Sequence, residues 1–431
     1  MASAPNTALI SAYRAAAWVA TPFARLLLAS RLKRGKEDAA RLNERFGRTA
    51  APRPKGPLVW LHGASVGEML SLLPLIDRLR GRGFHVLLTS GTVTSARLAA
   101  QRLPAGAVHQ FVPLDSPLFL RRFLRHWRPN LVLLAESELW PNLITEVNAR
   151  RVPLVLVNAR MSPRSFASWR RLPRSASALL ARVDLCLAQA EGDGQRYAKL
   201  GAPRVTVTGN LKFDAPPPPV DEAAFDALRQ ATSGRPMLVA ASTHEGEDEV
   251  VIAAHRGLRE AIPGLLTIIA PRHPQRGPAI IEAANGEEVP AVLRSDGYLP
   301  DRGTQIYVAD TIGELGLFYS LAPVALLGGS LVARGGQNPI EPAKLGAAIL
   351  HGPHIGNFEA VYDRLDTEGG AAKVTDAPSL AAAVRRLLDE EDARVRMTEA
   401  ARATITSLSG ALDRTLAAID PYLVQIRLER H

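Results

Sequence analysis

Short runs rich in valine and leucine recur along the first half of the chain, and stretches with helical periodicity separate them. The runs are Pro57–His62, His85–Ser90, Val108–Val112, Asn130–Ala135, Pro153–Asn158, Asp184–Ala188 and Arg204–Thr208. Runs this short and this continuously apolar are typical of parallel strands that helices cover on both faces. The alternation therefore predicts a doubly wound α/β domain.

Four consecutive prolines, Pro216–Pro219, interrupt this pattern. Proline favours extended backbone and cannot continue a helix, so the stretch is typical of a linker between domains. The pattern then restarts, with strand candidates at Pro236–Ser242, Leu265–Ala270, Pro290–Arg294, Gln305–Ala309, Pro323–Gly328 and Ala347–Leu350. Because 431 residues exceed one ordinary compact domain, we expect an α/β fold of two doubly wound, Rossmann-like domains that face each other across a cleft.

These breaks in the pattern divide the chain into five expected parts. They are an N-terminal segment (1–47), a first domain (48–214), the proline-rich linker (215–220), a second domain (221–405) and a C-terminal helix able to cross back to the first domain (406–431). No repeat of the solenoid type is visible.

Basic and acidic side chains are distributed unevenly. Through Asn210 there are 31 Lys and Arg against 12 Asp and Glu, a net charge of +19, whereas the remainder has 21 against 30, a net charge of −9. A basic half of this size indicates an anionic partner: a phosphorylated lipid, a membrane surface or a nucleic acid. No RNA-binding signature or helix-turn-helix spacing accompanies the arginines, so we expect no nucleic acid. The alternative is a solvated basic surface.

The N-terminal stretch from Thr7 to Ser30 is rich in alanine, leucine and valine, but two arginines and a proline break it. This makes a poor transmembrane span, and basic residues follow the apolar stretch rather than precede it, unlike a secretory signal. With Trp18 and Phe23 beside the basic residues 31–36, the stretch predicts an anchor lying on an anionic membrane surface. A helix docked on the body of the protein is the alternative.

Several kinds of site are not expected. The single cysteine, Cys186, excludes an intramolecular disulfide and suits a reducing compartment. It lies in an apolar run, where a buried structural thiol is more common than a nucleophile. No H-E-x-x-H or C-x-x-C motif occurs, so we expect no metal and no cofactor, and we expect no serine hydrolase chemistry.

The segment His62–Glu68 reads His-Gly-Ala-Ser-Val-Gly-Glu and directly follows the first strand candidate. Apolar residues then recur on one helical face, and Ser65 or Gly67 is able to cap this helix. Glu68 would lie in the first turn, where the helix dipole and free N–H groups favour a carboxylate ready to accept a proton from a hydroxyl. The alternative is a glutamate that only stabilises its own helix.

Two further segments of the first domain place charged side chains after strand candidates. Glu136 and Glu138 are close enough in sequence to bind an acceptor together or to tune Glu68, whereas helix capping is the alternative. Lys212 follows the last strand candidate of this domain. It is able to reach a phosphate or carboxylate in a closed cleft, or it is an exposed lysine at the hinge.

In the second domain, Arg272 immediately follows a strand candidate. Its guanidinium suits a phosphate at the carboxyl end of a parallel strand, and a surface salt bridge is the alternative. His273 is either a turn-capping residue or a ligand contact. The segment Asp310–Leu315 also follows a strand candidate, with Asp310 or Thr311 able to cap the next helix.

A glycine pair, Gly335 and Gly336, lies between the next strand candidate and a helix. Glycines there let a ligand approach the backbone, and Pro339 suits the first helical turn. A phosphate would lie on the free N–H groups at the helix start, and Glu341 would bind ribose hydroxyls. The segment is neither G-x-G-x-x-G nor a P-loop, and a structural glycine turn is the alternative.

Taken together, six segments in this order resemble the 3-deoxy-D-manno-octulosonic acid (Kdo) transferase family, inner-core glycosyltransferases of lipopolysaccharide assembly. They are His62–Glu68, Glu136–Asn142, Gly209–Asp214, Arg272–Arg276, Asp310–Leu315 and Gly335–Glu341. The resemblance covers nearly the whole chain, including Arg41–Gly47. Two positions depart from the family pattern: Gln337 stands where histidine is frequent, and Arg334 stands where a smaller or apolar residue is expected.

The resemblance implies an inverting, metal-independent GT-B enzyme at the cytoplasmic face of the inner membrane. Its donor would be CMP-Kdo, bound by the second domain, and its acceptor a lipid A precursor, lipid IVA, bound by the first. Glu68 would be the catalytic base. The expected acceptor-binding or accessory residues are Ser65, Gly67, Glu136, Glu138 and Lys212. The expected donor-binding residues are Arg272, His273, Ile312, Gly313, Glu314, Leu315, Gly336, Asn338 and Glu341.

Two other functions fit parts of the sequence. A nucleotide-sugar epimerase shares the two-domain plan but would need no lipid-facing anchor. A non-enzymatic peripheral membrane protein would explain the anchor and the basic half but not the cleft motifs. Product analysis with a UDP-sugar tests the first, and calorimetry with CMP tests the second.

Overall fold

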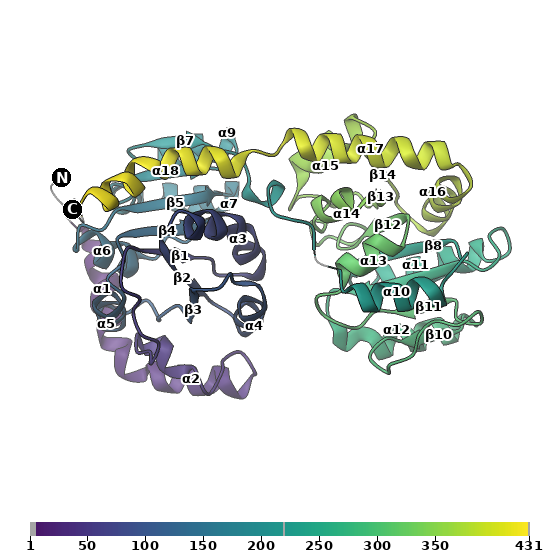
Figure 1. The fold of residues 1–431 in the computed structure, drawn as a ribbon, viewed down its shortest axis with the longest axis horizontal. Coiled ribbons are helices and arrows are strands. Elements are labelled where there is room, and N and C mark those ends of the chain that lie inside the picture. The colour runs from purple at the N-terminus through teal and green to yellow at the C-terminus, as the bar shows by residue number, and fades with distance from the viewer. Residues whose placement is uncertain (1–5, 219, 430–431) are drawn as a thin grey trace. The chain divides into compact units, whose positions relative to one another are not determined.

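The structure is a computed structural model that describes residues 6–218 and 220–429 (Figure 1). The chain divides into two compact units: unit 1 is Met1–Ala215 with Leu408–His431, and unit 2 is Pro216–Ser407. Pro219 of the expected linker lies outside the described residues, as do the first five residues of the N-terminal segment and the last two of the C-terminal helix.

Unit 1 contains a sheet whose seven strands, over its described residues, are parallel and lie in the order β3-β2-β1-β4-β5-β6-β7. The strands are β1 (Leu58–His62), β2 (His85–Ser90), β3 (Ala107–Phe111), β4 (Leu131–Ala135), β5 (Leu154–Ala159), β6 (Leu185–Ala188) and β7 (Val205–Val207). The helices are α1 (Ala8–Ala20), η1 (Thr21–Phe23), α2 (Ala24–Lys33), η2 (Leu42–Phe46), α3 (Val66–Gly81), α4 (Val93–Arg102), α5 (Pro117–Trp127), α6 (Pro141–Asn148), α7 (Pro163–Arg170), α8 (Pro173–Leu180), α9 (Glu191–Lys199), η3 (Leu211–Phe213) and α18 (Ala411–Leu428).

Unit 2 also contains a parallel sheet, with seven strands among its described residues in the order β10-β11-β9-β8-β12-β13-β14. The strands are β8 (Met237–Thr243), β9 (Leu266–Pro271), β10 (Ala291–Leu293), β11 (Ile306–Val308), β12 (Val324–Leu327), β13 (Ala348–His351) and β14 (Ala371–Lys373). The helices are α10 (Glu222–Ala231), α11 (Glu247–Leu258), η4 (Pro274–Arg276), α12 (Gly277–Gly286), α13 (Leu315–Leu321), α14 (Ile340–Leu345), α15 (Glu359–Thr367), α16 (Ala377–Asp389) and α17 (Glu391–Ser407).

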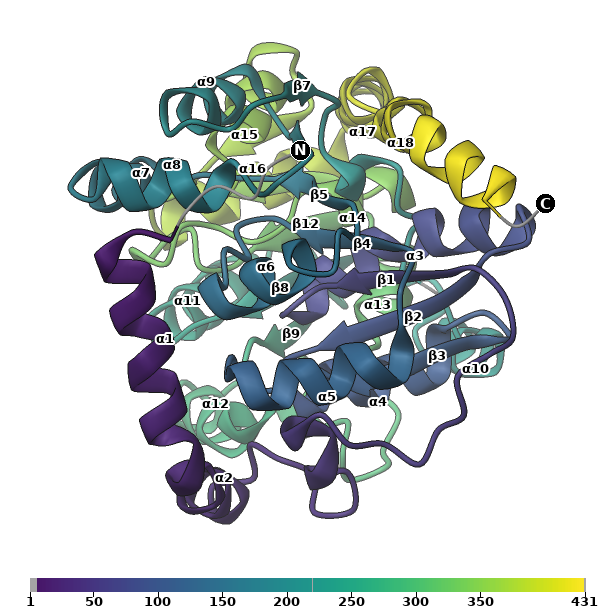
Figure 2. The same ribbon diagram turned by 90° about the vertical axis from the view of Figure 1, so that its left-hand side faces the viewer.

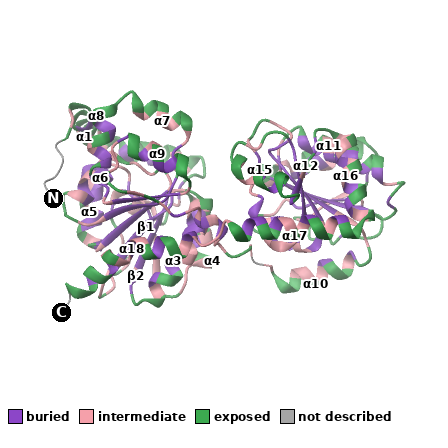
Figure 3. Ribbon diagram, turned by 90° about the horizontal axis from the view of Figure 1, so that it is seen from above, coloured by how far each residue is buried: buried purple, intermediate pink, exposed green. Residues whose placement is uncertain are grey.

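The predicted fold of two doubly wound α/β sheets is confirmed. Alternate residues of one strand explain why the strands read as continuously apolar: Leu58 and Trp60 of β1 belong to the core on one face of the sheet, and Val59 and Leu61 to the core on the other. All four side chains are fully buried, and Figure 3 colours β1 as buried. A strand that helices cover on both faces has no polar face to show in its sequence.

The N-terminal helices are docked on unit 1 and still expose apolar side chains. Helix α1 packs against α5 and α6 (Figure 2). Its Tyr13 hydroxyl donates to Asp115 (3.0 Å), and Arg14 pairs with Glu146 (2.8 Å). The large apolar side chains exposed on α1, η1 and α2 are Leu9, Tyr13, Trp18, Val19, Phe23, Leu26 and Leu27. In the part of the chain that the structure describes, no helix is long and apolar enough to cross a membrane.

The last helix, α18, belongs to unit 1 although unit 2 precedes it in sequence. The Asp214 carboxylate accepts hydrogen bonds from the N–H groups of Gly410 (2.6 Å) and Leu412 (2.9 Å) at its start. Farther along, its Asp413 pairs with Arg78 of α3 (3.0 Å). Unit 1 is therefore assembled from two stretches of chain that are far apart in sequence.

Candidate active site

Glu68 lies in the first turn of α3, directly after β1. Ser65 is the N-cap of this helix, and its hydroxyl accepts a hydrogen bond from Glu68 N (3.3 Å). The Glu68 carboxylate folds back over the loop and accepts from Ala64 N (2.8 Å) and from Ser65 Oγ (2.8 Å). The arrangement differs from a capping box in that Glu68 accepts from the N–H of Ala64, the residue before the N-cap, rather than from that of Ser65. Of the two candidate caps, Ser65 is therefore the one used, and Gly67 lies inside the helix with open space beside its Cα.

The environment of Glu68 favours proton uptake. Burial is the main cause that raises the pKa of its carboxyl, and the charges of Glu136 and Glu138 raise it further. The hydrogen bonds from Ser65 and Ala64 act in the opposite direction but do not cancel these effects. A carboxylate with a raised pKa is a stronger base than an ordinary glutamate. Glu68 is thus both a helix-capping residue and a candidate base.

Glu136 and Lys212 form an ion pair at the same edge of the sheet. Lys212 Nζ donates to Glu136 Oε1 at 2.8 Å, and both side chains are half-buried. Glu136 has a φ of +53°, in the left-handed region, which costs a non-glycine residue about 1–2 kcal/mol. Tertiary contacts hold it there, among them the hydrogen bond from Glu136 N to Val157 O (3.0 Å). The anion that Lys212 reaches in this structure is therefore Glu136.

Glu138 lies beside the buried His62. The distance from His62 Nε2 to Glu138 Oε2 is 3.5 Å, and Trp140 Nε1 donates a hydrogen bond to the same oxygen. Burial alone would raise the pKa of Glu138, but its interactions with His62 and the hydrogen bond from Trp140 lower it. On its other side, His62 Nδ1 is 3.1 Å from the carbonyl oxygen of Thr89, which can only accept.

The three carboxylates of unit 1 thus have different surroundings. Glu136 has a lysine partner and Glu138 has a histidine partner, whereas the partners of Glu68 among the described residues are a backbone N–H and a hydroxyl. The pKa of Glu68 is raised and that of Glu138 is lowered. When neighbouring environments shift two carboxyl pKa values in opposite directions, the group with the raised value is the candidate for proton transfer.

In unit 2, the loop after β12 is organised by a carboxylate that the sequence reading did not single out. Glu247 of α11 is fully buried and accepts backbone hydrogen bonds from His244 (2.9 Å), Gly329 (2.6 Å), Ser330 (3.0 Å) and Leu331 (2.9 Å). Its only signal in the sequence is an acidic run after β8, which equally describes an exposed helix start. The Glu247 carboxylate therefore fixes the backbone conformation of the loop at Gly329–Leu331.

The glycines of this loop are required mainly because neighbouring backbone atoms leave no room for a Cβ. A Cβ on Gly328 would lie 2.4 Å from Ser242 O, so this glycine is required by packing rather than by a ligand. Gly336 has a φ of +74°, and its Cβ would lie 3.1 Å from His354 O. Gly336 N donates to Gly329 O (2.8 Å). The two glycine-containing segments are therefore joined as one turn.

Arg272 and His273 follow β9 directly, and both are exposed. Arg272 N donates to Thr243 O (2.9 Å), which ties this loop to the end of β8. Among the residues that the structure describes, the Arg272 guanidinium has no carboxylate partner, so the predicted alternative of a surface salt bridge is wrong. The His273 ring lies 6.0 Å from the His244 ring.

The segment before α13 differs from the expectation in two respects. Helix α13 begins at Leu315 with Glu314 as its N-cap residue. Asp310 and Thr311 therefore do not cap it, and the Asp310 carboxylate instead accepts from Ser295 N (2.9 Å). The Glu314 carboxylate is held by Arg294 through two contacts (2.6 and 2.5 Å), which leaves the backbone of Ile312 and Gly313 as the part open to a ligand.

Asn338 and Glu341 lie together at the start of α14. Asn338 Nδ2 donates to Glu341 Oε1 (3.2 Å), and Asn338 Oδ1 accepts from Ile340 N (3.1 Å). Pro339 is the residue just before the helix rather than its first residue. Burial raises the pKa of Glu341, and the hydrogen bond from Asn338 only partly offsets this. A half-buried carboxylate held in this way is a suitable acceptor for a hydroxyl.

The structure gathers the predicted residues into two groups, one in each unit. Ser65, Glu68, Glu136, Glu138 and Lys212 lie at one edge of the unit 1 sheet, and the donor-binding candidates follow β9, β11 and β12 in unit 2. Parallel strands carry their ligands at their carboxyl ends, where all these residues lie. Across the described ranges, no group of three or more metal-ligating side chains occurs.

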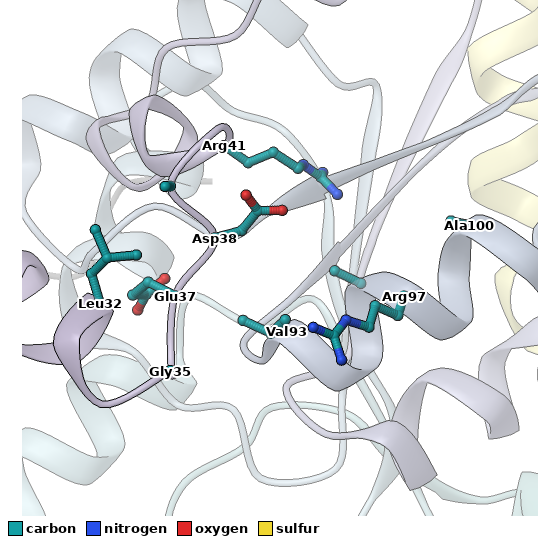
Figure 4. Close-up of a pocket in the computed structure, with 10 residues that line it drawn as sticks. Leu32, Gly35, Glu37, Asp38, Arg41, Val93, Arg97 and Ala100 are labelled. Atoms are coloured by element: carbon teal, nitrogen blue, oxygen red, sulfur yellow. The ribbon is translucent and has the colours of Figure 1, made fainter. Parts of the chain in front are cut away.

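A pocket of about 570 Å³ lies in unit 1 between the end of α2, the loop that follows it and α4 (Figure 4). Arg41 reaches it from the loop and Arg97 from α4, beside Leu32, Glu37 and Asp38. Arg41 is already bound by Glu44. None of the site residues predicted from the sequence lines this pocket, so it is distinct from the carboxylate cluster.

Comparisons with known proteins agree with the resemblance. Residues 40–215 match the family described as 3-Deoxy-D-manno-octulosonic-acid transferase (kdotransferase). The chain is 35% identical to the 3-deoxy-D-manno-octulosonic acid transferase of Haemophilus influenzae over 394 residues, 89% of this chain and 91% of that protein. It is 38% identical to the enzyme of the same name from Bordetella pertussis over 390 residues, 88% of this chain and 91% of that protein.

A solved structure supports the fold. The crystal structure of a glycosyltransferase from Rickettsia africae matches with a TM-score of 0.60 at 12% identity, covering 86% of this chain and 99% of that chain. At this identity the likeness concerns the fold alone. Because two relatives above 30% identity match nearly the whole chain, this protein belongs to the 3-deoxy-D-manno-octulosonic acid transferase family of glycosyltransferases.

Proposed function

We propose that this protein transfers Kdo from CMP-Kdo to a lipid A precursor, lipid IVA, with inversion at the anomeric carbon and Glu68 as the general base. Family membership supports Kdo transfer in lipopolysaccharide synthesis. The observation that carries the mechanism is the Glu68 carboxylate, which is oriented by Ser65 and Ala64 and has a raised pKa. A base of this kind matches the deprotonation of a sugar hydroxyl.

In the proposed reaction, Glu68 removes the proton from an acceptor hydroxyl as the hydroxyl oxygen attacks the anomeric carbon of Kdo. The new C–O bond forms as the bond to the CMP phosphate breaks, the proton ends on Glu68, and CMP leaves. The hydrogen bonds to Glu68 hold its carboxylate in one orientation. Glu138 stays ionised beside it, and Lys212 offsets the charge of Glu136.

Unit 2 supplies the groups that would hold CMP. Arg272 would bind the phosphate, the backbone of Ile312 and Gly313 would contact the nucleotide, and the N–H groups near Asn338 would receive charge that develops on the leaving group. Glu341 would accept from ribose hydroxyls. The transfer would need no metal, because a nucleoside monophosphate leaving group carries no diphosphate to chelate.

The N-terminal helices would hold the enzyme at its lipid acceptor. Their exposed apolar side chains lie beside basic ones, among them Lys33 and Arg34. Apolar side chains flanked by cations favour an anionic membrane surface, which we assign to the cytoplasmic face of the inner membrane. The acceptor is a phosphorylated glycolipid of that membrane, consistent with the basic charge of the first half of the chain.

The function is tested by incubating the full-length protein with CMP-Kdo and lipid IVA in detergent and measuring the product mass. We expect a product heavier than lipid IVA by whole Kdo residues, and unchanged activity in the presence of EDTA. Incubation with a UDP-sugar alone should give no epimer, and calorimetry should detect CMP binding. A protein that binds no CMP and forms no product would favour the non-enzymatic alternative.

The pH dependence of transfer follows from the Glu68 pKa. Because the base must be ionised, kcat/KM should rise with pH and level off above an apparent pKa higher than 4.5, the ordinary value for glutamate. Glu136→Gln should lower this apparent pKa, because it removes a negative charge that raises it. Initial rates over a pH series measure both values. An acid limb at the ordinary value, unchanged in Glu136→Gln, would contradict the assignment.

A further inference from the structure

A cluster of five arginines follows β5, and the mechanism uses none of them. The arginine cluster is Arg160, Arg164, Arg170, Arg171 and Arg174, and all five residues are exposed. Within the described residues none of them forms an ion pair with a carboxylate. Elsewhere in unit 1 arginines share carboxylates: Glu146 alone pairs with three of them. Five uncompensated cations in one hairpin make a strongly positive surface.

Hydrogen bonds and apolar contacts with the rest of unit 1 fix the backbone of α7 and the residues just before it, where most of the arginine cluster lies. Ser162 caps α7 by accepting from Ser165 N (3.1 Å). Just before it, Met161 N donates to the Asp193 carboxylate (2.8 Å). Phe166 and Trp169 pack against the core of unit 1, whereas α7 buries none of its residues fully (Figure 3). The guanidinium groups are therefore displayed from a fixed backbone.

Two contacts place the arginine cluster between the carboxylates and the N-terminal helices. The Tyr197 hydroxyl is 3.2 Å from Glu136 O and 3.3 Å from Arg160 O, so the backbone at the start of the cluster lies close to the backbone of Glu136. At its other end, Ser175 Oγ of α8 is 2.8 Å from Thr7 Oγ1, the N-cap of α1. Figure 2 shows α8 close to the first turn of α1.

We propose that the arginine cluster binds the phosphate groups of the lipid acceptor, an inference that rests on the proposed function. A guanidinium matches a phosphate through two parallel N–H donors. The exposed apolar side chains suited to a membrane surface lie on α1, η1 and α2, whereas the cluster begins at Arg160, whose backbone Tyr197 links to that of Glu136. We therefore assign to the cluster a phosphate ester on the acceptor itself rather than a bulk lipid headgroup.

The test is the triple variant Arg164→Gln/Arg171→Gln/Arg174→Gln in the full-length protein, assayed with CMP-Kdo. With the phosphorylated acceptor we expect the acceptor KM to rise about 10- to 100-fold, because three exposed guanidinium groups, each contributing modestly in solvent, are removed together. The donor KM and kcat should stay close to wild type. With an enzymatically dephosphorylated acceptor, wild type and variant should have the same raised KM.

A matched control removes the same charge from unit 2. Arg302, Arg396 and Arg402 are exposed, and the described part of the chain offers them no ion-pair partner. The variant Arg302→Gln/Arg396→Gln/Arg402→Gln should keep the wild-type acceptor KM. Thermal denaturation of both triple variants checks that they fold.

Three results separate the inference from its alternatives. An acceptor KM that the cluster variant leaves unchanged overturns it. If that variant co-sediments more weakly with anionic vesicles and its acceptor KM does not depend on the acceptor phosphate, the cluster binds the membrane. This result also overturns the inference. If wild type forms no product, the proposed function fails, and phosphate-dependent binding of the acceptor in micelles, lost in the cluster variant, still supports the site.

Discussion

Glu68→Gln should lower kcat for Kdo transfer by about 10²- to 10⁴-fold, the usual contribution of a general base. The glutamine cannot take the proton of the acceptor hydroxyl at neutral pH. Its amide oxygen is still able to accept from Ala64 N, as Glu68 does at 2.8 Å, so the first turn of α3 should remain formed. The loss would then reflect chemistry rather than folding.

Single-turnover rates with CMP-Kdo and lipid IVA measure this effect, and calorimetry with CMP shows whether the donor site remains intact. CMP affinity should not change, because the residues assigned to CMP all lie in unit 2. Glu191→Gln is a matched control, since Glu191 is also in the first turn of a unit 1 helix but is exposed. If Glu68→Gln kept more than about a third of the wild-type rate, Glu68 would not be the base.

Glu247→Ala should disrupt unit 2 and its affinity for CMP together. The change leaves four backbone N–H groups without their acceptor, those of His244, Gly329, Ser330 and Leu331. Each unsatisfied buried donor costs about 1–3 kcal/mol, so we expect the free energy of unfolding to fall by about 3 kcal/mol or more. Because Gly336 N donates to Gly329 O, the same change should also weaken CMP binding at least tenfold, by about 1.4 kcal/mol.

Urea unfolding measures the first effect and calorimetry with CMP the second. Glu245→Ala is the control, because Glu245 is a carboxylate of the same segment whose side chain is exposed. It should leave both quantities within about 0.5 kcal/mol of wild type. A Glu247→Ala protein as stable as this control would show that the loop does not depend on the buried carboxylate.

Strands, their order along the chain and their parallel character could be predicted because they depend on short-range apolar runs. The strand that was missed, β14, has only three residues, Ala-Ala-Lys, which carry no β-branched side chain. The starts of α13 and α14 were also predicted one or more residues too early. Which polar residue caps a helix depends on the other hydrogen bonds available to each candidate. The Asp310 carboxylate accepts a hydrogen bond from Ser295 N, 15 residues upstream, instead of capping α13.

The sequence by itself determined the two doubly wound sheets, the position of Glu68 in the first turn of a helix, and the basic character of the first half. Only the tertiary structure decided which partners the charged groups have. Lys212 meets Glu136 across 76 residues, and Glu247 meets the loop at Gly329 across 82 residues. Apolar periodicity is a local property and can be read from neighbouring residues. The pairing of buried charges depends on which distant chain segments the packed core brings together, and the order of residues alone does not reveal those segments.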